Sequence, residues 1–233
     1  MNIIKTPEEI NSMRAGGKKL GTILKELLFM STVGVNLLDL EKHAKKRVQE
    51  EGGQPSFTTV EGYPFVTCLC INEEVVHGMP RNDSLCDGDI LTIDIGMIYQ
   101  GLHTDTASSI CIGMKDDKKE LFLKTGEIAL EKAIEAAGYH VVADLTGHGV
   151  GRVLHEEPMI PEYVRGDIAR TSLLSSGMTL AIEVIYAMGK GSICYKSDDG
   201  WTLESKDRSL TATFEHTIAI GEQKSDVLTE RDI

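Results

Sequence analysis

Five side chains that commonly bind metal ions occur at matching places in the two halves of the sequence. Asp94 lies six residues after Gly88 in Gly-Asp-Ile-Leu-Thr-Ile-Asp, and Glu183 lies six residues after Gly177 in Gly-Met-Thr-Leu-Ala-Ile-Glu. Each of these acids ends an apolar run rich in β-forming residues, where a carboxylate is normally excluded from a core. A second acid flanked by threonine follows in each half, and a histidine lies between them: Asp105, Glu215 and His148.

Four carboxylates gathered in one place would repel one another strongly unless cations neutralised them. Two divalent ions would balance the four negative charges. One imidazole with four carboxylates makes an oxygen-rich site that suits manganese, iron(II), cobalt or zinc. The sequence therefore predicts a pair of divalent metal ions, and this prediction is the strongest indication of function.

The composition is that of an ordinary globular enzyme. The chain has 233 residues, 41% of them hydrophobic and 26% charged, which allows a substantial buried core. Its net charge of −12 argues against nonspecific nucleic-acid binding, so we expect no DNA partner. Five cysteines without a disulfide-like spacing favour a reducing cytoplasm. We find no signal peptide and no run that would require a membrane, and we expect residues 1–233 to form a single catalytic domain.

Helix signals are clearest near the N-terminus. Thr6 as N-cap, Pro7 in the first turn and Glu9 three residues after the cap predict a helix that runs to about Phe29. A second helix is predicted over residues 38–51, where Gly52-Gly53 would end it. A third is predicted over 117–137.

Strands are predicted over 65–71, 90–98, 102–112, 139–146, 178–187 and 210–220. The order of elements predicts an α+β fold of two related halves, with an antiparallel-leaning sheet and helices on one face. The strands at 90–98 and 102–112 should form a hairpin. If Tyr99 and Gln100 form its turn, Asp94 faces Asp105 directly, with Cβ atoms roughly 5 Å apart. Two like charges there would destabilise the hairpin unless they share a metal ion.

Several longer motifs closely resemble those of the methionine aminopeptidases, which are single-domain pita-bread metallopeptidases. The matching segments cover nearly the whole chain, from Ile4-Lys5-Thr6-Pro7-Glu8 onward, and the strongest are residues 71–80, residues 147–158, Trp201-Thr202 and residues 206–210. The resemblance implies a pita-bread fold with a curved sheet and helices on the outer face. Because only 32 residues separate Glu183 from Glu215 and no large domain precedes the motifs, the chain is most similar to the type I enzymes.

The resemblance also implies how the metal ions are held. Asp94 would bind one ion, His148 and Glu183 would bind the other, and Asp105 and Glu215 would bridge the two. Glu183 would take a proton from the attacking water and pass it to the leaving amine.

Further roles follow from the same resemblance. His77 would contact the amide of the second substrate residue, and His155 would stabilise the oxyanion of the tetrahedral intermediate. The substrate would be the N-terminus of a nascent polypeptide, from which the initiator methionine is removed when the second residue is small. The residues that match the family pocket are Tyr63, Cys68, Leu154 and Trp201, together with His77 and His155. Leu154 replaces an aromatic residue often found in the family, and Val60 also departs from some members.

Each motif also has an interpretation without catalysis. Asp94 and Asp105 alone could be solvent-facing hairpin residues, and His77 or His155 alone would more often be structural. The one-residue gap in Cys68-Leu69-Cys70 is poor for metal or redox chemistry. Two other functions stay open: a single-domain Xaa-Pro aminopeptidase or dipeptidase of the same fold, and an inactive pita-bread protein that binds peptides or ribosomes.

One feature departs from the family pattern. The N-terminal half is predicted to have two helices before its strands, whereas the C-terminal half has one, so roughly twenty residues are missing between Asp105 and His148 relative to typical family members. None of the five predicted ligands lies in that gap. Because loss of a helix would expose apolar surface, we expect a tendency to form a homodimer.

Overall fold

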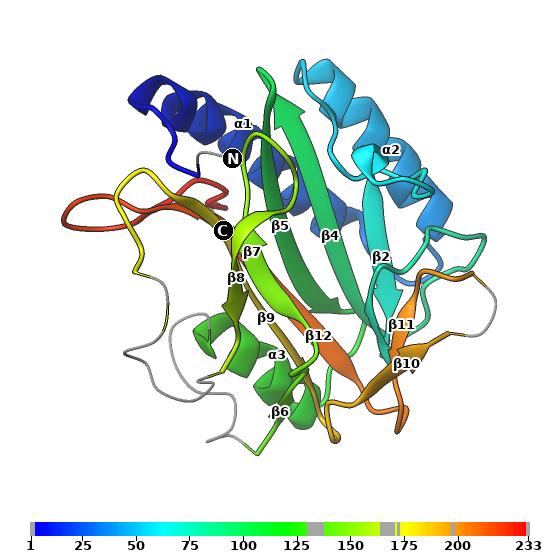
Figure 1. Cartoon of the computed structure of the whole chain (residues 1–233). Helices are drawn as coiled ribbons and strands as arrows, with labels where there is room; N and C mark the ends of the chain where they lie inside the picture. The colour runs from blue at the N-terminus through cyan, green and yellow to red at the C-terminus, as the bar shows by residue number, and fades with distance from the viewer. Residues whose placement is uncertain (1–2, 130–137, 164–170, 172, 197–198, 232–233) are drawn as a thin grey trace.

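Three α-helices and three antiparallel sheets make up the described part of the chain (Figure 1). The computed structural model describes residues 3–129, 138–163, 171, 173–196 and 199–231. The helices are α1 (Pro7–Met30), α2 (Leu37–Glu50) and α3 (Asp117–Ala129), with a short 3-10 helix η1 (Phe57–Thr59). No helix among these residues is both long and apolar enough to cross a bilayer.

The ends of the first two helices follow the predicted signals. The Thr6 hydroxyl accepts a hydrogen bond from the Glu9 N–H (3.2 Å), and the Glu9 carboxylate accepts one from the Thr6 N–H (2.7 Å), which forms the predicted capping box. Helix α2 is capped at Asn36 and ends before Gly52, whose φ of 75° requires the left-handed conformation that glycine adopts easily.

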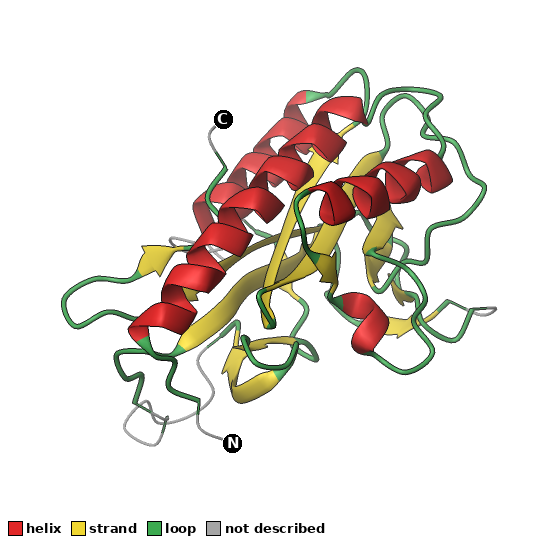
Figure 2. Cartoon of the chain, turned by 90° about the horizontal axis from the view of Figure 1, so that it is seen from above, coloured by secondary structure: helices red, strands yellow, loops and turns green. Residues whose placement is uncertain are grey.

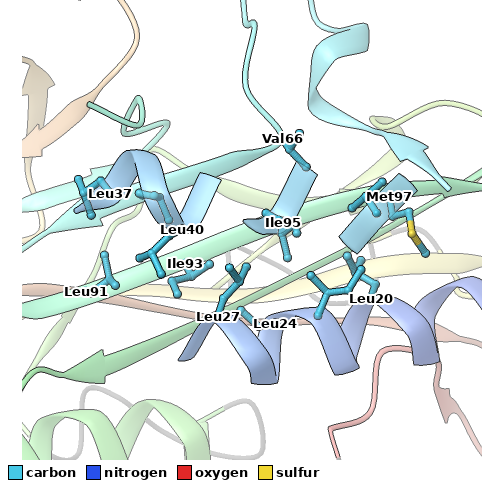
Figure 3. Close-up of a cluster of buried hydrophobic side chains, with 14 of the residues drawn as sticks. Leu20, Leu24, Leu27, Leu37, Leu40, Val66, Leu91, Ile93, Ile95 and Met97 are labelled. Atoms are coloured by element: carbon cyan, nitrogen blue, oxygen red, sulfur yellow. The ribbon is translucent and has the colours of Figure 1, made fainter. Parts of the chain in front are cut away.

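The first sheet carries the N-terminal half of the site. Its strands are β1 (Gln54–Pro55), β2 (Thr67–Ile71), β4 (Ile90–Tyr99) and β5 (Leu102–Cys111), in the order β1-β4-β2 with β5 on β4. Figure 2 shows α1 and α2 lying over one side of the strands. Leucines of both helices meet aliphatic side chains of β4 in a fully buried cluster (Figure 3), which leaves the opposite side of the sheet for polar residues.

A buried carboxylate ties α2 to this sheet. Glu41 accepts hydrogen bonds from the N–H groups of Val66 (2.8 Å) and Thr67 (3.0 Å) and from the Thr67 hydroxyl (2.7 Å). Its side chain thereby fixes the start of β2, which carries Cys68.

Replacement of Glu41 by alanine is expected to lower the free energy of unfolding by roughly 3 kcal/mol, because it would leave three buried donors without partners. Urea denaturation would measure the loss. Lys45→Ala on the exposed side of the same helix is the matched control, for which we expect a change within about 0.5 kcal/mol. Equal losses for the two variants would contradict the assignment.

The second sheet carries the C-terminal half of the site. It has the order β13-β12-β9-β7-β8, with β6 also pairing β9. Its strands are β6 (His140–Val141), β7 (Thr146–Gly149), β8 (Glu156–Pro161), β9 (Thr179–Ala187), β12 (Thr211–Ala219) and β13 (Asp226–Val227). A third sheet, in the order β10-β11-β3, joins β3 (Glu74–Val76) to β10 (Ile193–Tyr195) and β11 (Leu203–Ser205).

Helix α3 covers the outer side of this second sheet. Phe122 of α3 packs against Tyr186 of β9, with ring centroids 4.5 Å apart, and shares a buried cluster with Val184 and Phe214. These side chains alternate with Glu183 and Glu215 along β9 and β12, so the acids point to the opposite side of the sheet. The arrangement bears out the α+β prediction with helices outside and acids inside.

Some predicted elements differ from the observed ones. The strand predicted over 139–146 is two short strands, β6 and β7, separated by a turn in which the Leu145 N–H bonds the Val142 carbonyl (3.1 Å). The very short strands β1, β3, β10, β11 and β13, and also β8, were not predicted because short segments carry little periodicity.

The predicted third helix is described only to Ala129, and the remainder of its range, 130–137, lies outside the described residues. Residues 138–149 contain β6 and β7 and no helix.

The register of the β4–β5 hairpin corrects a prediction. The turn is Gln100-Gly101, with φ values of 52° and 80°, rather than Tyr99-Gln100. Two positive φ angles are typical of a two-residue hairpin turn that matches the twist of the strands, and a positive φ favours glycine at the second turn position. Asp94 consequently pairs with Ala107, and Asp105 pairs with Gly96. The two acids are diagonal neighbours on one face instead of direct partners, still within reach of a shared ion.

Candidate active site

A single cavity brings together every residue that the sequence analysis assigned to the site. Its volume is about 340 Å³. The predicted residues that line it are Tyr63, Cys68, His77, Asp94, Asp105, His148, Leu154, His155, Glu183, Trp201 and Glu215. Because these residues come from strands of two sheets and from loops far apart in the sequence, only the folded chain can assemble them.

The five predicted ligands come from five different strands. Asp94 and Asp105 lie on β4 and β5, while His148, Glu183 and Glu215 lie on β7, β9 and β12. Glu183 and Glu215 are direct cross-strand partners. Ligand atoms of Asp105, His148 and Glu215 all lie within 4.8 Å of one another, close enough to surround a single ion.

The two strands that carry Asp94 and Glu183 begin in the same way. Gly88 precedes β4 and Gly177 precedes β9, with φ values of 85° and 90°, conformations that glycine adopts without strain. Each strand then carries its acid at the same distance from the glycine. The repeated Gly-to-acid spacing in the sequence therefore corresponds to a repeated loop-to-strand transition.

Burial raises the pKa of all four carboxyl groups, and at three of them the neighbouring acids raise it further when no cation is near. Burial raises the pKa of Asp94 to about 7. The pKa of Asp105 lies well above its usual range because of burial and the nearby charges of Asp94 and Glu183. Burial, followed by neighbouring acids, also raises the pKa of Glu183 and of Glu215. Such a cluster is unfavourable as a purely structural feature.

The donor set fits divalent metal ions. Asp94 Oδ1 is buried and has no hydrogen-bond partner among the described residues, although buried carboxylate oxygens are normally satisfied. Burial lowers the pKa of His148 to about 4, so its imidazole is neutral at physiological pH. Its Nδ1 lies 2.8 Å from the Gly149 carbonyl, which leaves Nε2 free to face the cavity. An unpaired carboxylate oxygen and an oriented neutral imidazole are both ready to bind a cation.

The two candidate catalytic histidines flank this cluster and are exposed to the cavity. The rings of His155 and His148 are 4.5 Å apart between centroids. His77 has a φ of 59°, uncommon for a residue with a side chain, and its ring lies 6.4 Å from that of Trp201. Such a conformation at a cavity wall is typical of a functional site.

A buried ion pair holds the loop that carries His155. Glu156 accepts hydrogen bonds from the N–H groups of Arg152 (2.6 Å) and Val153 (3.2 Å) and pairs with Lys5. The side chains of Lys5 and Glu156 are 1% and 3% exposed. The N-terminal segment of the chain thus restrains the orientation of His155.

The apolar end of the cavity matches the predicted pocket. Tyr63, Cys68 and Leu154 form a buried cluster with Phe57, against which Trp201 packs. Burial raises the pKa of the Cys68 thiol, which is therefore an uncharged part of the wall. The Tyr63 hydroxyl donates to the Thr67 carbonyl (2.9 Å). The predicted departure at Val60 also lies in this wall.

The sequence analysis missed part of the cavity wall and one half-buried acid. That part of the wall includes Val76, Asp144, Leu145, Thr146, Met159 and Ile185, residues without a catalytic signature. Glu162 lies beside β9, where its Oε2 accepts the Ile185 N–H (2.8 Å) and burial raises its pKa to about 8. Its carboxylate fills a gap in the strand ladder between β6 and β7. In the sequence, the only sign of this acid's role was its place directly after Ile160-Pro161.

Comparison with known proteins agrees with this geometry. The model of Metallopeptidase family M24 matches residues 11–137 and 122–222. A methionine aminopeptidase of Mycoplasma capricolum is 36% identical over 257 aligned positions, which cover 100% of each chain. The crystal structure of the methionine aminopeptidase from Thermotoga maritima superposes with a TM-score of 0.93 at 36% identity, and covers 99% of this chain and 100% of the other.

More distant relatives share only the fold. The prolidase from Pyrococcus furiosus has a TM-score of 0.75 at 22% identity, and this chain spans 66% of its length. Residues 122–137 are matched by both segments of the family model. The chain belongs to Metallopeptidase family M24, and it is similar over its whole length to methionine aminopeptidases.

Proposed function

We propose that this protein removes the N-terminal methionine from polypeptides with the help of two divalent metal ions. The observation that carries the proposal is the convergence of four carboxylates, three histidines and an apolar pocket in one cavity. The full-length similarity to methionine aminopeptidases supports the same activity.

The five ligands would divide between two ions. Asp94 would bind one ion, His148 and Glu183 would bind the other, and Asp105 and Glu215 would bridge them. Manganese, iron(II), cobalt and zinc all suit this set of oxygens and one imidazole nitrogen. When bound, the ions would polarise the scissile carbonyl and lower the pKa of the attacking water.

The protein side chains would then move protons and hold the substrate. Glu183 would accept the proton of the attacking water and deliver it to the leaving amine. His155 would donate a hydrogen bond to the oxygen that becomes negative, and His77 would contact the amide of the second residue. The methionine side chain would lie in the pocket formed by Tyr63, Cys68, Leu154 and Trp201.

A small second residue should be preferred, because a branched side chain would crowd the cavity between His77 and the wall formed by Val76, Leu145 and Ile185. With added manganese or cobalt, we expect Met-Ala-Ser to be cleaved at least tenfold faster than Met-Leu-Ser, as judged by kcat/KM. Release of free methionine gives the measurement. Equal rates for the two peptides would refute the specificity, and failure to cleave either with every metal tested would refute the function.

The same assay separates the alternatives. An Xaa-Pro peptidase would cleave Ala-Pro peptides faster than Met-Ala-Ser, whereas an inactive peptide-binding protein would cleave neither. The similarity to prolidases at 22% identity concerns the fold alone. Elemental analysis after saturation with manganese would show fewer than one ion per chain for an inactive scaffold, and two for the proposed enzyme.

The cellular setting follows from the proposed substrate. Nascent polypeptides carry the initiator methionine, so we place the protein in the cytoplasm, with transient ribosome association and residues 1–233 as one catalytic domain. A homodimer remains a prediction that light scattering can test. The outer-face side chains of β9 are 0–8% exposed at Leu180, Val184 and Tyr186, whereas Leu121 and Ile128 of α3 are 57% and 50% exposed.

A further inference from the structure

The two acids proposed to bridge the metal ions lie on strands of different sheets. Asp105 is on β5, which pairs with β4, and Glu215 is on β12, which pairs with β9 and β13. Every residue of β5 and β12 is described, and no backbone hydrogen bond joins these two strands. A β-ladder therefore does not determine the distance between the bridging carboxylates.

Threonine hydroxyls join the two strands instead. Thr217 Oγ1 accepts a hydrogen bond from the backbone N–H of Asp105 (2.9 Å) and donates one to the backbone carbonyl of the same residue (2.8 Å). Thr106 Oγ1 donates to the backbone carbonyl of Glu215 (2.8 Å). Thr106 and Thr217 are both 0% exposed, so solvent water is not at hand to replace either hydroxyl.

We propose that Thr217, assisted by Thr106, is a positioning residue that sets the spacing of the bridging carboxylates. The proposal rests on the dinuclear site described above. Metal ligands are held within about 0.2 Å of their ideal distances, and groups that orient ligands typically change metal affinity about 10- to 100-fold. Thr217 holds both polar backbone atoms of Asp105. Loss of its hydroxyl would leave a buried N–H and a buried carbonyl without this partner and let the Asp105 carboxylate move relative to Glu215.

A second hydroxyl bridge in the same seam provides an internal control. Ser109 Oγ accepts a hydrogen bond from the Thr213 N–H (2.8 Å) and donates one to the Thr213 carbonyl (2.9 Å). Thr217 makes the same pair of bonds to Asp105. Ser109 is also buried, and it lies four residues from Asp105, while Thr213 lies two residues from Glu215. Its removal would weaken the same seam, and free the Thr92 hydroxyl 2.7 Å away, without removing a hydrogen bond from the backbone of Asp105 or Glu215.

The test compares Thr217→Val, Thr217→Ser and Ser109→Ala in the whole chain. Titration calorimetry with Co(II) gives the metal affinity, the Co(II) absorption spectrum reports ligand geometry, and thermal unfolding reports stability. We expect Thr217→Val to weaken Co(II) binding about tenfold and to alter the spectrum. Thr217→Ser, which keeps the hydroxyl, should restore both. Ser109→Ala should lower the melting temperature while the affinity and the spectrum stay those of the wild type.

Unchanged Co(II) binding in Thr217→Val would overturn the proposal, and so would an equal loss in Ser109→Ala. If Thr217→Val does not fold, Thr106→Val provides a second comparison, which also removes the acceptor of an Arg231 hydrogen bond (3.0 Å), with weakened Co(II) binding expected and unchanged binding as the refutation. None of these measurements uses peptide cleavage. A wild-type chain that binds two Co(II) ions but does not cleave Met-Ala-Ser would refute the proposed function and leave this inference to be decided by the metal data.

Discussion

Glu183→Gln is expected to lower kcat for Met-Ala-Ser at least a hundredfold at saturating manganese. Glutamine keeps the size of the side chain and one oxygen for a metal ion, but it cannot accept the proton of the attacking water. Proton transfer by a positioned side chain typically contributes about 10²- to 10⁴-fold to a rate. Steady-state kinetics over a series of manganese concentrations would separate this effect from a loss of metal binding.

Glu50→Gln is the control for this substitution. Glu50 is exposed at the end of α2, does not line the cavity and is not among the charges that shift the pKa of Glu183. We expect kcat within about threefold of the wild type, in line with a substitution that leaves the transition state untouched. A fall in kcat of less than tenfold for Glu183→Gln with metal saturated would remove Glu183 from the proposed role.

The metal-free protein is expected to lose stability as the pH rises from 6.5 to about 8. The pKa of Asp94 in the folded, metal-free chain is about 7, against an unperturbed value of 3.8. The pKa values of Asp105, Glu183 and Glu215 shift in the same direction. At these four acids the folded state therefore holds more protons than the unfolded state above pH 4. The stability contributed by these groups is present at low pH and is lost as the pH rises through their folded pKa values.

The interval above pH 6.5 separates the titration of the acids from that of the histidines. Desolvation lowers the pKa of five histidines below 6.5, so these groups add stability only as the pH rises toward that value: His77, His103, His148, His155 and His216. An acid that is protonated in the folded state and ionised in the unfolded state changes the free energy of unfolding by at most about 1.4 kcal/mol per pH unit. Several such groups would produce a fall of several degrees in melting temperature for a chain of this size, at about 2–4 °C per kcal/mol.

Thermal unfolding at pH 6.5 and pH 8 would measure the effect, once with EDTA and once with manganese. With EDTA the melting temperature should fall between the two pH values, and Asp94→Asn should reduce the fall. With manganese the fall should be smaller, because the ionised carboxylates of the cluster bind the ions and protons no longer compete there, while Glu162 still loses its proton in this interval. A melting temperature that rises with pH in EDTA would contradict the carboxylate cluster.

The local chemistry of this chain is readable from short segments. The Thr6 and Glu9 capping box depends on residues three apart, and the glycines before β4 and β9 adopt the positive φ angles that turns require. The identities of the five candidate ligands also follow from local patterns, since an acid at the end of an apolar strand is costly without a partner. These features depend on neighbours in the chain, and for that reason they could be predicted.

The hairpin between β4 and β5 marks where local patterns stop being sufficient. Tyr99-Gln100 and Gln100-Gly101 are both possible two-residue turns, and they differ by two residues in the pairing of Asp94. Both registers place Asp94 and Asp105 on the same face, so alternation of apolar and polar residues cannot distinguish them. The positive φ angles at both turn positions favour the glycine-containing turn.

Only the tertiary structure decided how the two halves meet. The hydroxyl bridges from Thr217 to Asp105 and from Thr106 to Glu215 join residues more than a hundred positions apart. The wall formed by Val76, Leu145 and Ile185 likewise comes from separate segments: β3, the turn before β7, and β9. The sequence by itself determined which groups could bind metal and where the helices begin. Their distances were left to packing, because contacts between remote segments depend on the whole folded chain and carry no local periodicity.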